Sequence, residues 1–210
     1  NPTGRLIPAD LLEAVADWAR SNRLWLIADE VYEDYAYTGR HAYTRPLAPE
    51  RTFAAHSFSK AFGMAGNRCG YVAGPARAME RLERISIHNY YSTTTASQLA
   101  AVRALDGPGD RWVDHARPLY REAGASAAGI LGEPAPEGST FLFLNVSDRA
   151  AHHPDGLQGL LIELARHGIA VAPGPSFGPY PSHIRVCFTA DPPDVVERGM
   201  KRLAGLLGRS

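Results

Sequence analysis

The chain has 210 residues, of which 45% are hydrophobic and 21% are charged, a composition that is ordinary for one or two globular domains and argues against disorder. Its 22 basic and 22 acidic side chains cancel, which removes the electrostatic basis for a nucleic-acid or anionic-membrane partner. Apolar runs fall short of the ~20 residues that span a bilayer, and no signal segment is recognisable, so we expect a cytoplasmic protein with no membrane partner.

Apolar periodicity predicts alternating helices and short strands in the first 75 residues. Apolar positions after Pro8 recur at helical spacing and predict a helix that ends near Ser21. The apolar run at residues 24–28 predicts a strand buried on both faces, and further strands are expected at residues 52–57 and 71–73. The first two runs end on polar residues, which is typical of α/β proteins that bind ligands at strand ends.

The rest of the sequence predicts a linking helical region and a second domain. Residues 76–105 have a helical pattern with an interruption near residues 89–92, and Gly-Pro-Gly at residues 107–109 marks a boundary. Beyond it we expect helices at residues 110–131, 156–167 and 193–207 and strands at residues 140–146, 169–172 and 183–188. Residues 1–108 are therefore predicted to be an α/β part, and residues 109–210 an α+β domain of about 100 residues with its own core.

Lys60 and Asp29 are the first candidates for chemistry, because each lies just after a predicted buried strand. Partial burial of Lys60 favours the neutral amine, whose lone pair can form a Schiff base; the alternative is a solvated lysine that opens a helix. A buried carboxylate at Asp29 needs a cationic partner such as a protonated pyridine nitrogen, and Tyr32 follows one turn later. The alternative is that Asp29 and Glu30 cap a loop or a helix.

Two arginines are candidates for binding anions. Arg68 stands between Gly66 and Gly70, where its guanidinium suits a phosphate, with hydroxyls from Ser57 and Ser59 as further donors; the alternative is an ordinary surface arginine. Arg185 lies in an alternating strand, where it shares a face with His183 and Cys187. The branched residues Ile184 and Val186 are on the opposite face. Arg185 suits bidentate binding of a carboxylate, whereas the alternative is an exposed edge-strand arginine.

Five motifs, in this order and at this spacing, resemble the class I/II aminotransferases, which are fold type I pyridoxal-phosphate enzymes. They are Asn-Pro-Thr-Gly at residues 1–4, Asp-Glu-Val-Tyr at 29–32, Ser-Phe-Ser-Lys at 57–60, Gly-Asn-Arg-Cys-Gly-Tyr at 66–71, and Arg185. The resemblance covers the whole chain. It implies part of a large cofactor-binding domain, with a mostly parallel sheet and helices, followed by a small α+β domain.

The resemblance also implies a role for each matched residue. Lys60 would form the Schiff base with pyridoxal 5′-phosphate and carry the proton between substrate and cofactor. Asp29 would pair with the ring nitrogen, while Tyr32 and Asn1 would hydrogen-bond the ring's phenolic oxygen. The phosphate would be held by Ser57, Ser59 and Arg68. Asn1 and Arg185 would bind the substrate carboxylate, and no metal is implied.

The implied activity is transfer of an amino group between an α-amino acid and a 2-oxo acid. The family has a long stretch before the Asn-Pro-Thr-Gly motif, so the sequence resembles the C-terminal half of an aminotransferase, and a homodimer is implied. Two alternatives stay open: a lyase, decarboxylase or cyclase with the same cofactor, and an aminotransferase-like effector domain of a transcription regulator. Where aspartate-specific members carry an arginine, this sequence has His88 or Asn89, which leaves neutral, aromatic or specialised amino donors possible.

Overall fold

The structure is a computed structural model that describes residues 1–209, and these residues form two compact units. The N-terminal unit comprises Leu6–Ala116. The C-terminal unit comprises Asn1–Arg5 together with Arg117 and the described residues that follow it. The described helices include none that is both long enough and apolar enough to cross a membrane.

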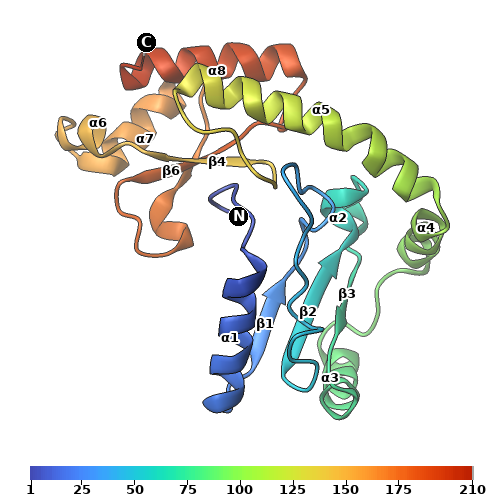
Figure 1. Cartoon of the computed structure of the whole chain (residues 1–210). Helices are drawn as coiled ribbons and strands as arrows, with labels where there is room; N and C mark the ends of the chain where they lie inside the picture. The colour runs from blue at the N-terminus through green and yellow to red at the C-terminus, as the bar shows by residue number, and fades with distance from the viewer. Residues whose placement is uncertain (210) are drawn as a thin grey trace. The chain divides into compact units, whose positions relative to one another are not determined.

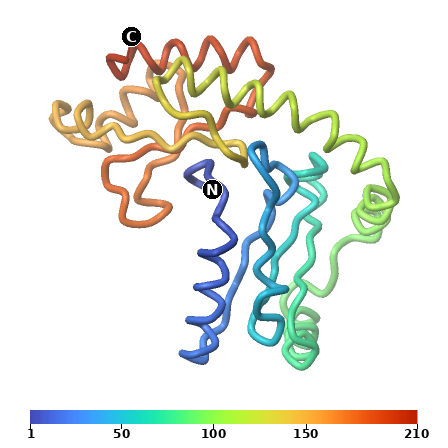
Figure 2. The backbone as a smooth tube through the Cα atoms, in the orientation of Figure 1, coloured from blue at the N-terminus to red at the C-terminus, as the bar shows by residue number. Residues whose placement is uncertain are grey.

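The N-terminal unit is built on a three-stranded sheet in the order β1-β2-β3 (Figure 1). Strands β1 (Leu26–Asp29) and β2 (Thr52–Ser57) are parallel, and β3 (Gly70–Ala73) is antiparallel to β2. The course of the three strands can be followed along the backbone in Figure 2. Because β1 and β2 are parallel, their C-terminal residues Asp29 and Ser57 lie toward the same end of the sheet.

Helix α1 (Ala9–Ser21) precedes the sheet and buries a narrow stripe of small and aliphatic residues. Leu12, Ala16 and Ala19 recur at spacings of four and three, which puts them on one face of the helix. The same helix also exposes Trp18, and the neighbouring strand exposes 82% of Ile27. The expectation that this strand is buried on both faces is therefore wrong for the described chain, because no described residue covers Ile27.

Short elements connect the strands of the N-terminal unit, and helices α3 (Ala76–Asn89) and α4 (Thr95–Leu105) follow them. Helix α2 (Phe58–Ala61) begins directly after β2, and a 3-10 helix η1 (Ala65–Asn67) leads toward β3. Helices α3 and α4 form within the predicted helical region, and the break between them begins at the predicted interruption. Thr94 caps α4 by accepting a hydrogen bond from the Ser97 amide.

The C-terminal unit packs helices around a second sheet of three antiparallel strands in the order β4-β6-β5. The strands are β4 (Phe141–Asn145), β5 (Ala172–Pro173) and β6 (His183–Cys187). The helices are α5 (Pro108–Leu131), of which the part from Arg117 belongs here, α6 (Ser147–Ala151), α7 (Gly156–Arg166) and α8 (Pro193–Leu207), with a 3-10 helix η2 (Gly174–Phe177). Its core includes Leu144, Leu160, Ile184 and Leu203, each almost fully buried.

Most predicted elements form near their predicted bounds. The exceptions are short: β5 covers only two residues, and α6 was not predicted at all. A five-residue helix presents too little periodicity to be detected in a sequence. The fold class is the predicted one, although the N-terminal sheet combines one parallel and one antiparallel pairing.

Candidate active site

The end of β1 presents Asp29, with Tyr32 in the turn that follows. Asp29 is the last residue of the strand and pairs in register with Ala55 of β2. Its side chain is exposed, contrary to the buried carboxylate expected from the apolar run, because the face of β1 that carries Ile27 and Asp29 has no cover among the described residues. Tyr32 is half-buried, and its ring centre lies 5.8 Å from Nζ of Lys60.

Lys60 is held by a short helix that the strand β2 runs into. Ser57 caps this helix, its Oγ accepting a hydrogen bond of 3.1 Å from the Ser59 amide. Phe58 and Ala61 face inward, while Lys60 is exposed rather than partly buried. The structure thus brings Lys60, Tyr32 and the two serines to the end of the sheet where Asp29 lies.

Tyr35 hydrogen-bonds the backbone of the helix that carries Lys60, and it was not among the predicted site residues. Its ring is 1% exposed, and its hydroxyl donates to the carbonyl of Ala61 at 3.0 Å and lies 3.4 Å from that of Lys60. These are carbonyls of the final residues of α2, which lack partners inside the helix. The only sequence signal is a tyrosine three positions after Tyr32, and that spacing alone does not show which tyrosine points inward.

Arg68 sits where the chain turns back to form β3. Its backbone is left-handed, with φ of 51°, and its Nη1 donates to the carbonyl of Ala65 at 2.9 Å. Gly70 is required two residues later because a Cβ there would lie 2.6 Å from the carbonyl oxygen of His56. The glycine thus lets β3 approach β2 closely and fixes the start of the strand beside Ser57, its partner in register. The side chain of Arg68 remains exposed.

The C-terminal unit holds the other two predicted site residues in direct contact. Arg185 shares a face of β6 with His183 and Cys187, as the alternation predicted, while Ile184 and Val186 are buried on the other face. Its Nη1 donates to Oδ1 of Asn1 at 2.8 Å. The guanidinium also lies over two aromatic rings, 4.0 Å from the centre of Phe141 and 4.4 Å from that of Phe177. Neither aromatic residue was among the predicted site residues.

Gly4 fixes Asn1 in this arrangement. Its φ of +71° is in the left-handed region, and a Cβ would lie 2.7 Å from the carbonyl oxygen of Phe141. The Gly4 carbonyl accepts hydrogen bonds from the amides of Glu137 (2.7 Å) and Gly138 (3.0 Å). The Asn-Pro-Thr-Gly motif is therefore anchored beside β4, and its first residue reaches the arginine of β6.

Two glutamates and two histidines form a cluster near the end of β1, and no pattern in the sequence singled them out. Glu30 is 4% exposed; its Oε1 accepts from the Thr44 amide at 2.8 Å and lies 3.7 Å from Nε2 of His41. His56 bridges to Glu33 at 2.7 Å through Nδ1 and lies 3.8 Å from Glu30 Oε2 through Nε2. Burial raises the pKa of Glu30, but His41, the Thr44 amide and His56 together outweigh burial and lower it below its ordinary value.

A cavity of about 1300 Å³ opens on the N-terminal unit between β3, α3 and the segment before α4, and His56 of this cluster is among the residues that line it. Apolar residues such as Val72, Leu82 and Ile85 line much of it, and Arg68 is the one residue of the predicted site among its lining. His88 and Asn89, which stand where aspartate-specific relatives are expected to carry an arginine, are the last residues of α3. Of the two, Asn89 lines the cavity.

Residues 1–203 match the family described as aminotransferase class I and II, and the chain belongs to that family. It is 31% identical, over its whole length, to an aspartate/prephenate aminotransferase of Thermus thermophilus, and 32% identical over 89% of its length to an arginine–pyruvate transaminase of Pseudomonas aeruginosa. The structure is similar to that of the aspartate aminotransferase of Thermus thermophilus with maleate, with a TM-score of 0.87 and 30% identity over 98% of the chain.

The chain spans about half the length of these relatives, namely 55% and 49% of the two curated proteins and 54% of the solved structure. The family implies pyridoxal 5′-phosphate, and the donor set of the N-terminal unit fits it. A carboxylate for the ring nitrogen, a phenol for the ring oxygen, an amine for the aldehyde, and two hydroxyls with a guanidinium for the phosphate are all present.

Proposed function

We propose that the protein carrying this chain is a pyridoxal-phosphate-dependent aminotransferase that transfers an amino group between an α-amino acid and a 2-oxo acid. One observation carries the proposal. The parallel pairing of β1 and β2 puts Asp29 at the same end of the sheet as the Ser57–Lys60 segment, so that a carboxylate and an amine end adjacent strands. Family membership supports it independently.

When bound, the cofactor supplies an electron sink for the carbanion that forms at the substrate's Cα. Lys60 would bond through Nζ to the cofactor's aldehyde carbon and, once released from it, would carry a proton to and from the substrate. Its exposed position on the first turn after β2 leaves the amine free to exchange partners. The buried hydroxyl of Tyr35 donates to the carbonyl of Ala61, the next residue, and so would keep the backbone of α2 in place while the Lys60 side chain moves.

Asp29 and Tyr32 would hold the ring, and three residues would hold the phosphate. The Asp29 carboxylate would keep the ring nitrogen protonated, and the Tyr32 hydroxyl would donate to the phenolic oxygen. Ser57, Ser59 and Arg68 would bind the phosphate. Arg68 uses one of its five N–H groups on the carbonyl of Ala65, which fixes the direction of the guanidinium.

Asn1 and Arg185 would bind the substrate's α-carboxylate. Asn1 and the two aromatic rings hold the guanidinium of Arg185 in place, so little side-chain entropy is lost when a carboxylate binds. A carboxylate held by a guanidinium fixes the orientation of the Cα–H bond, which determines which bond of the substrate breaks. Asn1 would also reach the cofactor's phenolic oxygen.

Several finer features complete the proposal. Residues 1–108 would be the C-terminal part of the large cofactor domain with its linking helix, and residues 109–210 the small domain. The protein would be a cytoplasmic homodimer. Relatives that bear the names of aspartate, prephenate and arginine–pyruvate aminotransferases differ in the amino acid they act on, so the donor is proposed only as an α-amino acid.

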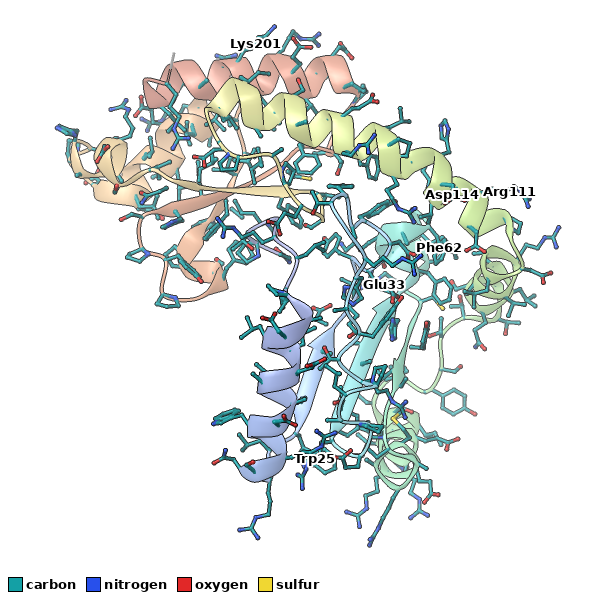
Figure 3. All side chains as sticks on the ribbon, viewed as in Figure 1. Trp25, Glu33, Phe62, Arg111, Asp114 and Lys201 are labelled. Carbon is teal, nitrogen blue, oxygen red and sulfur yellow. The ribbon has the colours of Figure 1, made fainter. Side chains whose placement is uncertain are left out.

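A transamination assay with paired lysine variants tests this function. The chain has two lysines, and Lys201 is exposed on α8 (Figure 3), where it contacts Glu197 at 2.5 Å. We expect the whole protein to convert a 2-oxo acid to its amino acid in the presence of an amino donor. Lys60→Ala should abolish this conversion and Lys201→Ala should leave it unchanged. Turnover that survives Lys60→Ala, or products that form without a 2-oxo acid acceptor, would contradict the proposal.

A further inference from the structure

We propose that Glu30, Glu33 and His56 bind a divalent transition-metal ion of the zinc class. One carboxylate oxygen from each glutamate and one ring nitrogen of the histidine lie within 4.8 Å of one another. All three residues lie in the N-terminal unit: the two glutamates at and just after the end of β1, and His56 on β2. Figure 3 labels Glu33, the acidic member that follows Tyr32.

Oε1 of Glu33 is hydrogen-bonded to Nδ1 of His56 at 2.7 Å, so Glu33 would turn away from this bond to join an ion held between Glu30 and Nε2 of His56. Oε2 of Glu30 is buried and has no hydrogen-bond partner among the described residues, and the same holds for Nε2 of His41. Oε2 of Glu30 lies 3.8 Å from Nε2 of His56, too far for a hydrogen bond. That separation is close to the spacing of about 3.4 Å between two ligands that lie about 2.1 Å from a tetrahedral ion.

Charge balance also favours a cation at this place. Two carboxylates lie together, one with a side chain 3% exposed and the other 17% exposed, and buried charge requires compensation. A divalent ion supplies two positive charges while the histidine stays neutral, which is the form that binds metals. Imidazole with carboxylates is a donor set that zinc accepts, whereas magnesium and calcium prefer oxygen ligands alone.

His41 would stand outside the ligand set and orient it. Its Nε2 lies 3.7 Å from Oε1 of Glu30, and the amide of Thr44 donates to the same Oε1. The second carboxylate oxygen, Oε2, therefore faces His56. On the other side of His56, the ring of Tyr71 stacks at 4.7 Å with an angle of 16° between the planes, which fixes the plane of the imidazole. Outer partners of this kind set the orientation of metal ligands.

An ion here would tie the turn after β1 to strand β2. Glu30 directly follows Asp29, and Glu33 directly follows Tyr32, so two ligands alternate with two residues of the proposed cofactor site. The ion would therefore fix the backbone of this turn. The inference rests on the geometry of the cluster and does not depend on the proposed aminotransferase activity.

Zinc titration of the EDTA-stripped protein, in competition with a chromophoric chelator, tests the site. We expect one Zn²⁺ per chain, with Mg²⁺ unable to compete. Glu33→Gln and His56→Gln should each weaken binding by more than about 100-fold, since loss of an outer partner alone costs about 10–100-fold. His153→Gln is the matched control, because His153 and Glu163 form another histidine–carboxylate pair, at 3.9 Å, outside the cluster.

Binding that is absent, or that is unchanged in His56→Gln, would overturn the proposal and leave the cluster a network of charged hydrogen bonds. Anomalous X-ray scattering at the zinc absorption edge, on crystals of the unmodified protein, provides a second measurement that does not depend on a variant keeping its fold. A peak within coordination distance of Glu30, Glu33 and His56 supports the site. A peak elsewhere, or none, contradicts it.

Discussion

Oδ1 of Asn1 accepts a hydrogen bond of 2.8 Å from Nη1 of Arg185, although the two residues stand 184 positions apart in the sequence. The contact depends on Gly4, which docks the first motif beside β4, and on β6, which presents the arginine on its half-buried face. Two motifs that are separated by nearly the whole sequence are therefore in direct contact within the C-terminal unit, where we propose that they bind the substrate carboxylate.

We expect Arg185→Lys to raise the KM for the amino acid substrate by about 10–100-fold, because hydrogen bonds to a charged group contribute about 1.5–3 kcal/mol. A lysine also cannot stack on Phe141 and Phe177 as a planar guanidinium does. Steady-state kinetics of the whole protein measure the effect. Arg198→Lys is the control and should leave KM unchanged, because Arg198 is exposed on α8 and pairs with Asp194. An unaltered KM in Arg185→Lys would exclude the proposed role.

Tyr35→Phe should destabilise the N-terminal unit by about 1–2 kcal/mol. The substitution removes a buried hydroxyl and leaves the carbonyl of Ala61 without its donor. Urea unfolding followed by circular dichroism gives the free energy of unfolding. Tyr91→Phe, at a residue that is 77% exposed, is expected to change stability by less than about 0.5 kcal/mol. Equal stability of the two variants would show that Tyr35 does not anchor α2.

Gly70→Ala should cost about 1–3 kcal/mol, because its Cβ would meet the backbone oxygen of His56 at 2.6 Å and one strand must shift. Gly66→Ala is the matched control four residues earlier, where a Cβ meets no atom within 4 Å. Thermal unfolding of both variants measures the difference in melting temperature. Equal melting temperatures of the two variants would contradict the close approach of β3 to β2 at Gly70.

The sequence predicted the elements well and the environment of the site less well. Strand β2 and helix α8 form where periodicity placed them, because each buries a face whose pattern is local. The apolar runs led us to expect Asp29 and Lys60 to be buried, but both are exposed, because burial depends on which residues cover a strand. For Lys60, the alternative of a solvated lysine that opens a helix describes its exposure correctly. The aromatic rings around Arg185 come from β4 and η2, and no local pattern joins those segments to β6.

Chemical trapping of the cofactor tests the central claim most directly. The whole protein, loaded with pyridoxal 5′-phosphate, is reduced with borohydride, digested and mapped by mass spectrometry. Because Lys60 and Lys201 are the only lysines of this chain, the position of the label within it is unambiguous. The account predicts a phosphopyridoxyl group on the peptide that contains Lys60. A labelled Lys201 peptide, or no labelled peptide from this chain, would contradict it.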